Sequence, residues 1–252
     1  MSSGDARLVI VTGGSRGIGA AVARLAGVRG YAVAVNYLQN QGAALRVVEE
    51  IELAGGSAVP IRGNVAQEAD IVRLFREAEE AFGRVYGLVN NAGITGGFAR
   101  VEEIQTKNLL DALVTNVAGP ILCAREAVKR MSTRNGGRGG SIVNISSLAA
   151  RTGGAGEWVH YAATKGAVNS FTVGLAREVA AEGIRVNAVA PGLIDTDIHA
   201  SNGAPDRPRL LSPSIPLRRS GRAEEVAEGV IWLLSDAASY TTGAILEIGG
   251  GR

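Results

Sequence analysis

The chain contains a tyrosine and a lysine four positions apart, Tyr161 and Lys165, within the stretch GEWVHYAATKGAVNSF. On an α-helix these two positions lie on the same face, one turn apart. A phenol has an ordinary pKa near 10, and a neighbouring ammonium group favours its ionised form. The pair is therefore a candidate for general acid/base chemistry, although an ordinary surface pair on a helix has the same spacing.

Three glycines, Gly13, Gly17 and Gly19, form a second candidate site in the stretch LVIVTGGSRGIGAAVARLA. They stand between a Val- and Ile-rich run and a helical pattern, where glycines allow a tight turn and a close backbone approach to a pyrophosphate. Their spacing, G-x-x-x-G-x-G, differs from the commoner G-x-G-x-x-G fingerprint. The cluster predicts a nucleotide-binding turn, and a turn without a ligand is the alternative.

The segment after the second apolar run bears on which dinucleotide is bound. In an NAD-binding turn, an acidic residue about twenty positions further on binds the ribose 2′-hydroxyl. Here that place holds Asn36 and Tyr37, which are not acidic. Arg16, inside the glycine cluster, carries the planar cation that suits a 2′-phosphate. We therefore predict a preference for NADP(H), with NAD(H) possible; a solvated arginine is the alternative.

Short apolar runs alternate along the chain with longer stretches of helical period. The runs predict strands near 8–12, 32–36, 58–62, 87–90, 141–146, 185–190 and 244–248. The helical patterns lie near 17–29, 40–54, 67–82, 108–132, 160–182 and 223–235. This alternation predicts an α/β fold, in which right-handed crossovers build a parallel sheet with helices on both faces.

The sequence shows no linker that would divide residues 1–252 into two domains, so we predict a single domain. Residues 197–221 lack a clear period and are rich in proline, which makes them a candidate substrate lid within that domain. One face of the helix predicted over 160–182 carries small residues that suit close association with another helix. They are Ala163, Gly166, Ala167, Ser170 and Gly174.

The composition argues against several classes of protein. A net charge of +2 without a basic stripe gives no reason to expect nucleic acid as a partner. The single cysteine, Cys123, excludes an intramolecular disulfide, and two histidines argue against a histidine-based metal site. The polar N-terminus predicts neither a signal peptide nor a membrane span, so we expect a cytoplasmic protein.

Six motifs stand in order along the chain: TGGSRGIG (12–19), NNAG (90–93), Asn116, Ser146-Ser147, YAATK (161–165) and PGLIDT (191–196). With these motifs the chain resembles the short-chain dehydrogenase/reductase family over nearly its whole length. It is most similar to the branch of 3-oxoacyl-carrier-protein reductases and sugar or steroid dehydrogenases. The resemblance implies a Rossmann-type doubly wound domain of about seven parallel strands. It also implies nicotinamide-dependent interconversion of a ketone and a secondary alcohol, and a homotetramer or homodimer.

The resemblance also implies roles for individual residues. Tyr161 is the expected general acid/base, Lys165 lowers its pKa and holds the nicotinamide ribose, and Asn116 anchors a water in a proton relay. Ser147 is expected to bind the substrate oxygen. The expected cofactor contacts are Gly13, Ser15, Arg16, Gly17, Ile18, Gly19, Asn36, Tyr37, Asn64, Val65, Asn91, Ala92, Gly93, Tyr161, Lys165, Pro191, Gly192, Ile194 and Thr196.

Ser146 and Ser147 are both candidates for the substrate-binding serine, and we choose Ser147 because the family usually uses the second of the pair. Tyr161 follows Ser147 by 14 positions, one more than is usual in the family. The extra residue lies in ARTGGAGEWVH and predicts a bulge in the loop beside the substrate. In that stretch Trp158 and His160 either line the pocket or pack the loop.

Other functions remain as alternatives. The nearest is an NAD(P)-dependent sugar or cyclic-alcohol dehydrogenase. A cofactor-binding regulator without turnover belongs to a different class, and the filled catalytic positions argue against it. The Tyr-x-x-x-Lys pattern and the Pro-Gly segment argue against an S-adenosylmethionine-dependent methyltransferase. The substrate pocket is expected to be built by residues 94–107, 148–160 and 193–217.

Overall fold

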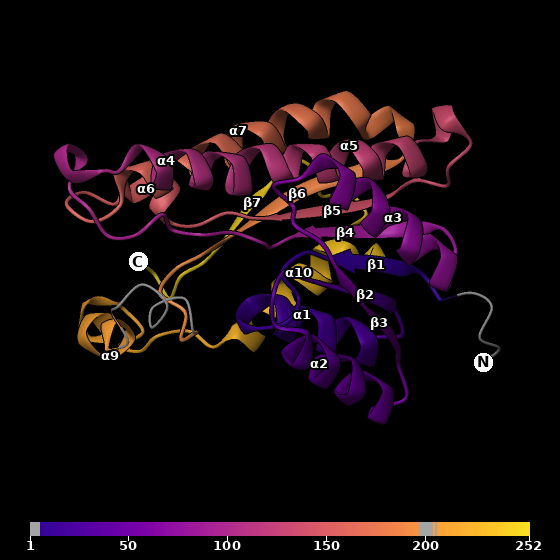
Figure 1. Ribbon diagram of the computed structural model, residues 1–252, viewed down its shortest axis with the longest axis horizontal. Coiled ribbons are helices and arrows are strands. Elements are labelled where there is room, and N and C mark those ends of the chain that lie inside the picture. The colour runs from indigo at the N-terminus through magenta and orange to yellow at the C-terminus, as the bar shows by residue number, and fades with distance from the viewer. Residues whose placement is uncertain (1–5, 197–203, 205) are drawn as a thin grey trace.

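The computed structural model describes residues 6–196, 204 and 206–252, and its centre is a sheet of seven parallel strands (Figure 1). The strand order is β3-β2-β1-β4-β5-β6-β7, so the connection from β3 to β4 crosses back over the first strands. The strands are β1 (Leu8–Val11), β2 (Ala32–Tyr37), β3 (Ser57–Arg62), β4 (Val85–Asn90), β5 (Gly140–Ile145), β6 (Ile184–Pro191) and β7 (Ile245–Ile248). Each predicted strand agrees with the structure to within two residues at either end. The predicted α/β doubly wound fold is therefore confirmed.

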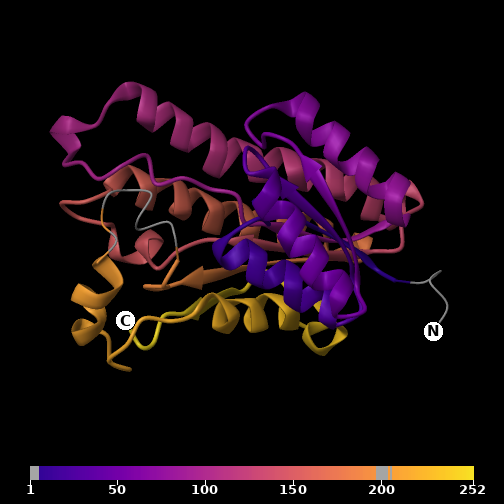
Figure 2. The same ribbon diagram turned by 60° about the horizontal axis from the view of Figure 1, so that its bottom comes forward.

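Helices cover both faces of the sheet, as Figures 1 and 2 show. On one side lie α3 (Glu68–Phe82), α4 (Thr106–Leu113), α5 (Gly119–Met131) and α7 (Val159–Val179). On the other side lie α1 (Gly17–Val28), α2 (Gln41–Leu53) and α10 (Ala223–Leu234). Two hydrophobic clusters result, one between the sheet and each helical layer. All four residues of β1 are fully buried, because both faces of a parallel sheet are covered.

The stretch 108–132, predicted as one helix, is divided in the structure. A π-helical turn, Val114–Ala118, separates α4 from α5 and has Asn116 at its centre. Such a turn inserts an extra residue into a helix and redirects the side chains around it, which periodicity alone does not reveal. The helix predicted over 160–182 ends earlier, at Val179, and continues as a 3₁₀ turn over Ala180–Glu182.

The sequence patterns did not predict the shortest helices. These are α6 (Ala149–Thr152), α9 (Arg207–Leu211) and 3₁₀ turns at Val101–Glu103, Thr133–Asn135, Ser212–Ser214 and Asp236–Ala238. Helices of one turn are too short to show a period. The predicted lid, 197–221, is described only in part, because residues 197–203 and 205 lie outside the described residues. Its described remainder contains α9 and pairs with the segment that follows β6 through the bridge between Ile194 and Gly221.

Candidate active site

A cavity of about 1550 Å³ opens along the edge of the sheet where the strands end. Parallel strands place all their carboxyl ends at this edge, and the strand order reverses between β1 and β4, where ligands of such sheets bind. Of the expected cofactor contacts, the following line it: Gly13, Ser15, Arg16, Gly17, Ile18, Asn36, Asn64, Val65, Asn91, Ala92, Gly93, Tyr161, Lys165, Pro191, Gly192, Ile194 and Thr196. Ser147 lines it as well. Three of the expected site residues, Gly19, Tyr37 and Asn116, are not among the described residues that line the cavity.

The glycine-rich turn is packed against the loop after β4. Gly13 adopts φ 61°, a left-handed conformation that a side chain disfavours. The Asn91 side chain donates hydrogen bonds to the carbonyls of Thr12 and Gly13, at 2.9 and 3.0 Å. A Cβ on Gly19 would overlap both the Gly13 carbonyl and the Asn91 amide, so Gly19 lets α1 approach the turn. Gly19 therefore allows α1 to pack against the turn and is not among the described residues that line the cavity.

The N-terminal end of α1 can accept an anion. Its first turn contains no acidic residue, and the preceding Arg16 forms no side-chain cap with the helix N–H groups. Unsatisfied N–H groups and the positive end of the helix dipole together favour a phosphate at such an end. Since Gly17 and Arg16 line the cavity at this point, the residues present fit the pyrophosphate of a dinucleotide.

Asn36 and Tyr37 support the site from behind. Asn36 is 2% exposed; its Oδ1 accepts the Gly13 N–H at 3.2 Å, and its Nδ2 donates to the carbonyls of Ile61 and Gly63 at 3.3 and 3.0 Å. Tyr37 packs into the core between the sheet and α1 with α2. Tyr37 is not among the described residues that line the cavity, and its expected contact with a cofactor stays a prediction.

The end of β3 is held by short polar contacts. The Asn64 N–H donates to Asp70 at 2.8 Å, and Asn64 Oδ1 accepts the Ala66 N–H at 3.0 Å. The Val65 carbonyl lies against Gly119, where a Cβ would come within 2.9 Å of it. These contacts fix the loop after β3 along the cavity, where Asn64 and Val65 were expected to frame an adenine.

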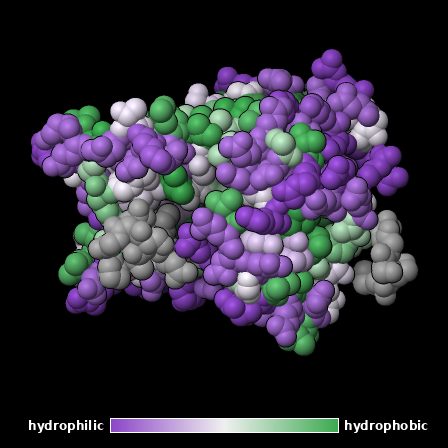
Figure 3. Space-filling view, viewed as in Figure 1, coloured by the Kyte–Doolittle hydropathy of each residue, from purple (hydrophilic) through white to green (hydrophobic). Residues whose placement is uncertain are grey.

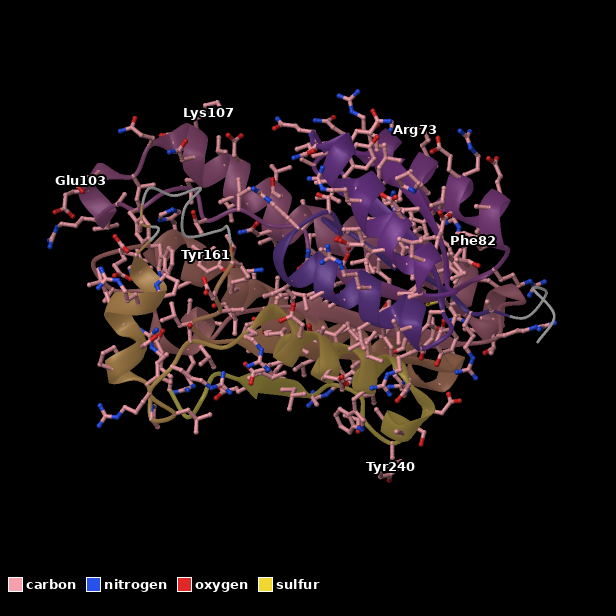
Figure 4. All side chains as sticks on the ribbon, turned by 90° about the horizontal axis from the view of Figure 1, so that it is seen from below. Arg73, Phe82, Glu103, Lys107, Tyr161 and Tyr240 are labelled. Atoms are coloured by element: carbon pink, nitrogen blue, oxygen red, sulfur yellow. The ribbon has the colours of Figure 1, made fainter. Side chains whose placement is uncertain are left out.

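Tyr161 and Ser147 lie together on the cavity wall. Figure 4 shows Tyr161 in the interior of the molecule, whereas Tyr240 projects from its periphery. Burial raises the pKa of Tyr161 to about 12, and a hydrogen bond with the Ser147 side chain opposes this rise in part. Ser147 Oγ also accepts the Ala149 N–H at 3.1 Å, whereas Ser146 donates to the Lys165 carbonyl at 3.3 Å. Of the two serines, Ser147 is thus the one that acts on the pKa of the phenol.

Lys165 lies one turn after Tyr161 and is buried. Its Nζ donates to the Ile145 carbonyl at 2.7 Å and lies 5.6 Å from the centre of the Tyr161 ring. Burial lowers the pKa of Lys165 to about 8, because the charged form loses hydration. Burial raises the pKa of Tyr161, and the expected lowering of that pKa by Lys165 stays a prediction.

Asn116 is held by both of its amide hydrogens. Its Nδ2 donates to the Ile94 carbonyl and to Thr164 Oγ1, at 2.7 and 3.0 Å, and its Oδ1 accepts the Ile94 N–H at 2.9 Å. A Cβ on Gly93 would lie 3.2 Å from Asn116 Oδ1 and 3.7 Å from Lys165 Nζ. The two side chains thus meet around Gly93, although Asn116 is 1% exposed. The predicted relay water remains a prediction.

The stretch expected to bulge contains α6 followed by glycines with left-handed φ, Gly153, Gly154 and Gly156. Trp158, which follows them, lines the cavity. His160 instead packs against Gly96, where a Cβ would lie 2.9 Å from its Nε2, and neither ring nitrogen has a hydrogen-bond partner among the described residues. In the structure Trp158 thus lines the cavity and His160 packs the loop, whereas the sequence left both alternatives open for each residue.

Several residues that line the cavity were not named individually from the sequence, and Arg46 and Arg207 are two of them, although Arg207 lies within the segment 193–217 that was expected to build the substrate pocket. Arg46, on α2, lines it at the end near Asn36, and Arg207, on α9, lines it at the end near Trp158. A search for basic residues after the second strand finds Arg46. Arg207 has no such signal, because its partner Glu157 lies 50 positions away in the sequence.

The structure describes residues 6–196, 204 and 206–252, and two kinds of feature are absent from these ranges. They contain no group of three or more His, Cys, Asp or Glu side chains that could hold a metal ion. They also contain no helix long and apolar enough to cross a membrane.

A nucleotide-binding edge with a tyrosine, a serine and a lysine beside it defines a dinucleotide-dependent oxidoreductase, and the comparisons with known proteins agree. Residues 13–252 match the family model described as enoyl-(acyl carrier protein) reductase. The chain belongs to the short-chain dehydrogenase/reductase family, whose members are oxidoreductases that bind NAD(P)H.

Individual relatives cover the whole length of the chain. The uncharacterized oxidoreductase YgfF of Escherichia coli K12 is 49% identical over 97% of this chain and 99% of its own length. A 3-oxoacyl-(acyl-carrier-protein) reductase of Staphylococcus aureus is 38% identical over 96% of both chains. Among solved structures, a dehydrogenase/reductase from Sinorhizobium meliloti has a TM-score of 0.90 at 36% identity, over 99% of this chain and 96% of its own. A short-chain dehydrogenase/reductase variant from Serratia marcescens has a TM-score of 0.89 at 33% identity, over 99% of both.

Proposed function

We propose that this enzyme uses NADPH to reduce a ketone to a secondary alcohol, with Tyr161 as the proton donor. The observation that carries the proposal is that Tyr161, Ser147 and Lys165 line the same cavity as Arg16 and Gly17 at the N-terminus of α1. The same cavity thus offers an anion site for a dinucleotide and two hydroxyl groups for a carbonyl oxygen. The similarity to 3-oxoacyl-(acyl-carrier-protein) reductases favours a 3-oxoacyl thioester as the substrate.

The cofactor would be held by the chain's own groups along the carboxyl edge of the sheet. The N–H groups of α1 suit its pyrophosphate, Arg16 suits a 2′-phosphate, and Asn64 and Val65 frame the adenine end. When bound, the reduced nicotinamide supplies a hydride to the carbonyl carbon. Arg16 is exposed. Among the described residues that line the cavity, the carboxylates are Asp111 and Glu157, and neither lies in the segment directly after β2. The absence of a carboxylate after β2 favours NADP(H) over NAD(H).

Tyr161 and Ser147 would act on the substrate oxygen. As the carbonyl carbon is reduced, negative charge builds on this oxygen, and hydrogen bonds from the two hydroxyls stabilise it. A phenol whose pKa is about 12 is protonated at neutral pH, so Tyr161 holds the proton that the new alkoxide needs.

Lys165 would place a positive charge and a transferable proton near the phenol of Tyr161. It is buried, and its Nζ and Asn116 Oδ1 both lie near Gly93. With a pKa of about 8, Lys165 can carry a proton at neutral pH and release it with little cost. After proton transfer, its positive charge stabilises the Tyr161 phenolate.

We expect the enzyme to consume NADPH when it is given an acyclic ketone or a 3-oxoacyl thioester. The measurement is the loss of nicotinamide absorbance with acetoacetyl thioesters, sugars, steroids and quinones, each tested against NADPH and NADH. Oxidation of a sugar or cyclic alcohol, with no ketone reduced, would replace the proposal with the dehydrogenase alternative. Tight NADPH binding without turnover of any substrate would indicate a regulator.

We also propose that the enzyme is a homotetramer or homodimer associated through the outer face of α4, α5 and α7. Leu110, Leu113 and Ile121 are 54%, 39% and 38% exposed on these helices, and such side chains suit a covered surface. A Cβ on Gly166 or Gly174 would meet nothing within 4 Å, so both glycines face outward. Figure 3 shows hydrophobic side chains among hydrophilic ones along this side of the molecule.

Light scattering at micromolar concentration is therefore expected to give a mass above that of one chain, 25.9 kDa. Leu110→Glu should lower this mass, because it places a charge within the apolar face. Leu53→Glu is the matched control: Leu53 is 82% exposed on α2, on the other side of the sheet, and its replacement should leave the mass unchanged. A monomeric mass for the unmodified chain would contradict the proposal. The cytoplasmic location and the single domain over residues 1–252 remain predictions.

A further inference from the structure

Trp158 stands at the substrate end of the cavity, next to the proposed proton donor. Its ring centre lies 5.5 Å from that of Tyr161, with the two planes tilted by 47°. Trp158 also precedes α7 directly, and its carbonyl accepts the Ala162 N–H at 3.0 Å. The indole is therefore fixed to the same helix end that carries Tyr161.

Phe98, Arg207 and Glu157 together hold the indole of Trp158 in place, and we call these three residues the clamp. Phe98 stacks on it with ring centres 4.8 Å apart and planes 19° from parallel. The Arg207 guanidinium lies 4.7 Å from the indole centre and 5.3 Å from the Phe98 centre, within the range of cation–π attraction. A Cβ on Gly154 would overlap the indole, so this glycine allows the ring to lie directly against the loop backbone.

The guanidinium of the clamp is itself anchored. Arg207 forms a two-pronged ion pair with Glu157, with N–O distances of 2.7 and 2.5 Å. Its side chain is 11% exposed, so the pair is only weakly screened by solvent. The carbonyl of Glu157 accepts the Ala99 N–H at 2.8 Å. Three segments far apart in the sequence, around Phe98, Glu157 and Arg207, thus converge on one indole.

A clamped indole beside the proton donor limits what the substrate can place there. If the carbonyl oxygen lies between the hydroxyls of Tyr161 and Ser147, the two groups on the carbonyl carbon point to different sides of it. Trp158 occupies the side next to Tyr161, and its neighbours leave it little freedom to move. Packed protein walls do not yield to added atoms without a loss of favourable contacts.

We propose that Trp158 is a specificity-determining residue that admits only a small group on one side of the carbonyl carbon. Arg207, Glu157 and Phe98 act as positioning residues that hold the indole in place. This inference rests on the proposed ketone reduction and names a limit on its substrates.

The test uses aryl alkyl ketones whose alkyl group grows from methyl to ethyl to isopropyl. In the unmodified enzyme, kcat/KM with NADPH should fall about tenfold for each added carbon. In Trp158→Ala this dependence should shrink to about twofold per carbon. Trp232→Phe is the control, since Trp232 is 42% exposed on α10 and should leave the series unchanged.

The clamp has an independent readout, because the chain contains two tryptophans and Trp232→Phe leaves Trp158 as the only reporter. In this background, Arg207→Met should at least double the quenching of Trp158 fluorescence by acrylamide and should weaken the size dependence. Arg207→Lys keeps the positive charge but not the planar, two-pronged guanidinium. Its quenching by acrylamide should therefore lie between that of the enzyme with Arg207 and that of Arg207→Met.

The outcomes separate the two proposals. Equal kcat/KM across the series in the unmodified enzyme, or an unchanged size dependence in Trp158→Ala, would overturn the role of Trp158 and leave ketone reduction standing. Failure of the unmodified enzyme to reduce any ketone would remove the proposed function and this inference together. Unchanged quenching in Arg207→Met would remove Arg207 from the clamp even if Trp158 keeps its role.

Discussion

Replacing Tyr161 with phenylalanine is expected to reduce kcat for ketone reduction by about a thousandfold or more, within the range that general acid catalysis supplies. The ring that packs beside Trp158 is kept, and only the hydroxyl that is hydrogen bonded to Ser147 is lost. Without it, the proton donor that the proposed mechanism places at the substrate oxygen is lost. Stopped-flow measurement of nicotinamide absorbance in a single turnover would report the chemical step directly.

NADPH affinity should change by less than about threefold in Tyr161→Phe, because the main cofactor contacts lie along the strand ends and α1. A fluorescence titration of NADPH would measure it. Tyr240→Phe is the matched control, since the Tyr240 side chain is fully exposed, at 103%, and its hydroxyl has no place in the site. A Tyr161→Phe enzyme that kept its kcat within tenfold of the original would remove Tyr161 from the mechanism.

Replacing Arg16 with alanine is expected to raise KM for NADPH by about 30- to 100-fold, as the loss of a charge-assisted bond to a phosphate implies. Arg16 lines the cavity immediately before α1, where a planar cation can meet a 2′-phosphate. NADH lacks this phosphate, so its KM should change by less than about threefold. Initial rates with both cofactors at a saturating ketone concentration would give the two ratios.

The comparison needs a control for the general effect of removing a positive charge. Arg29 directly follows the same helix and forms an exposed ion pair with Glu228 at 3.3 Å, away from the cavity. Arg29→Ala should therefore leave both KM values nearly unchanged. Equal losses for NADPH and NADH in Arg16→Ala would mean that Arg16 holds a part common to both cofactors, and the preference for NADP(H) would lose its support.

Local sequence patterns were sufficient for the main elements of the fold. The strand runs of Val and Ile and the helical periods between them have boundaries close to those of the structure, because each signal depends only on neighbours in the chain. The π turn at Asn116 was missed, since it changes the hydrogen bonding of a helix without interrupting its apolar period. The one-turn helix α9 was missed because five residues are too few to show a period.

The expected site residues met different outcomes for reasons that can be stated physically. The strand-end residues Asn64 and Asn91 reach the cavity because parallel strands all finish at one edge. Tyr37 packs into the core and is not among the described residues of the cavity, so its contact with a cofactor stays a prediction. The structure favours Ser147 over Ser146, because Ser147 acts on the pKa of Tyr161 whereas Ser146 donates to the Lys165 carbonyl, and the role of Ser147 stays a prediction.

The sequence by itself determined the order of the elements, the presence of a glycine-rich turn and the one-turn spacing of Tyr161 and Lys165, because these depend on residues that are close along the chain. Tertiary structure alone decided the electrostatics of that pair. The raised pKa of Tyr161 and the lowered pKa of Lys165 arise from burial beneath segments distant in sequence. It alone decided the clamp on Trp158, too, because Phe98, Glu157 and Arg207 meet only when three separate segments fold over the same end of the sheet. Packing and ion pairing between distant segments leave no local signal in a sequence, and they act only once the chain is folded.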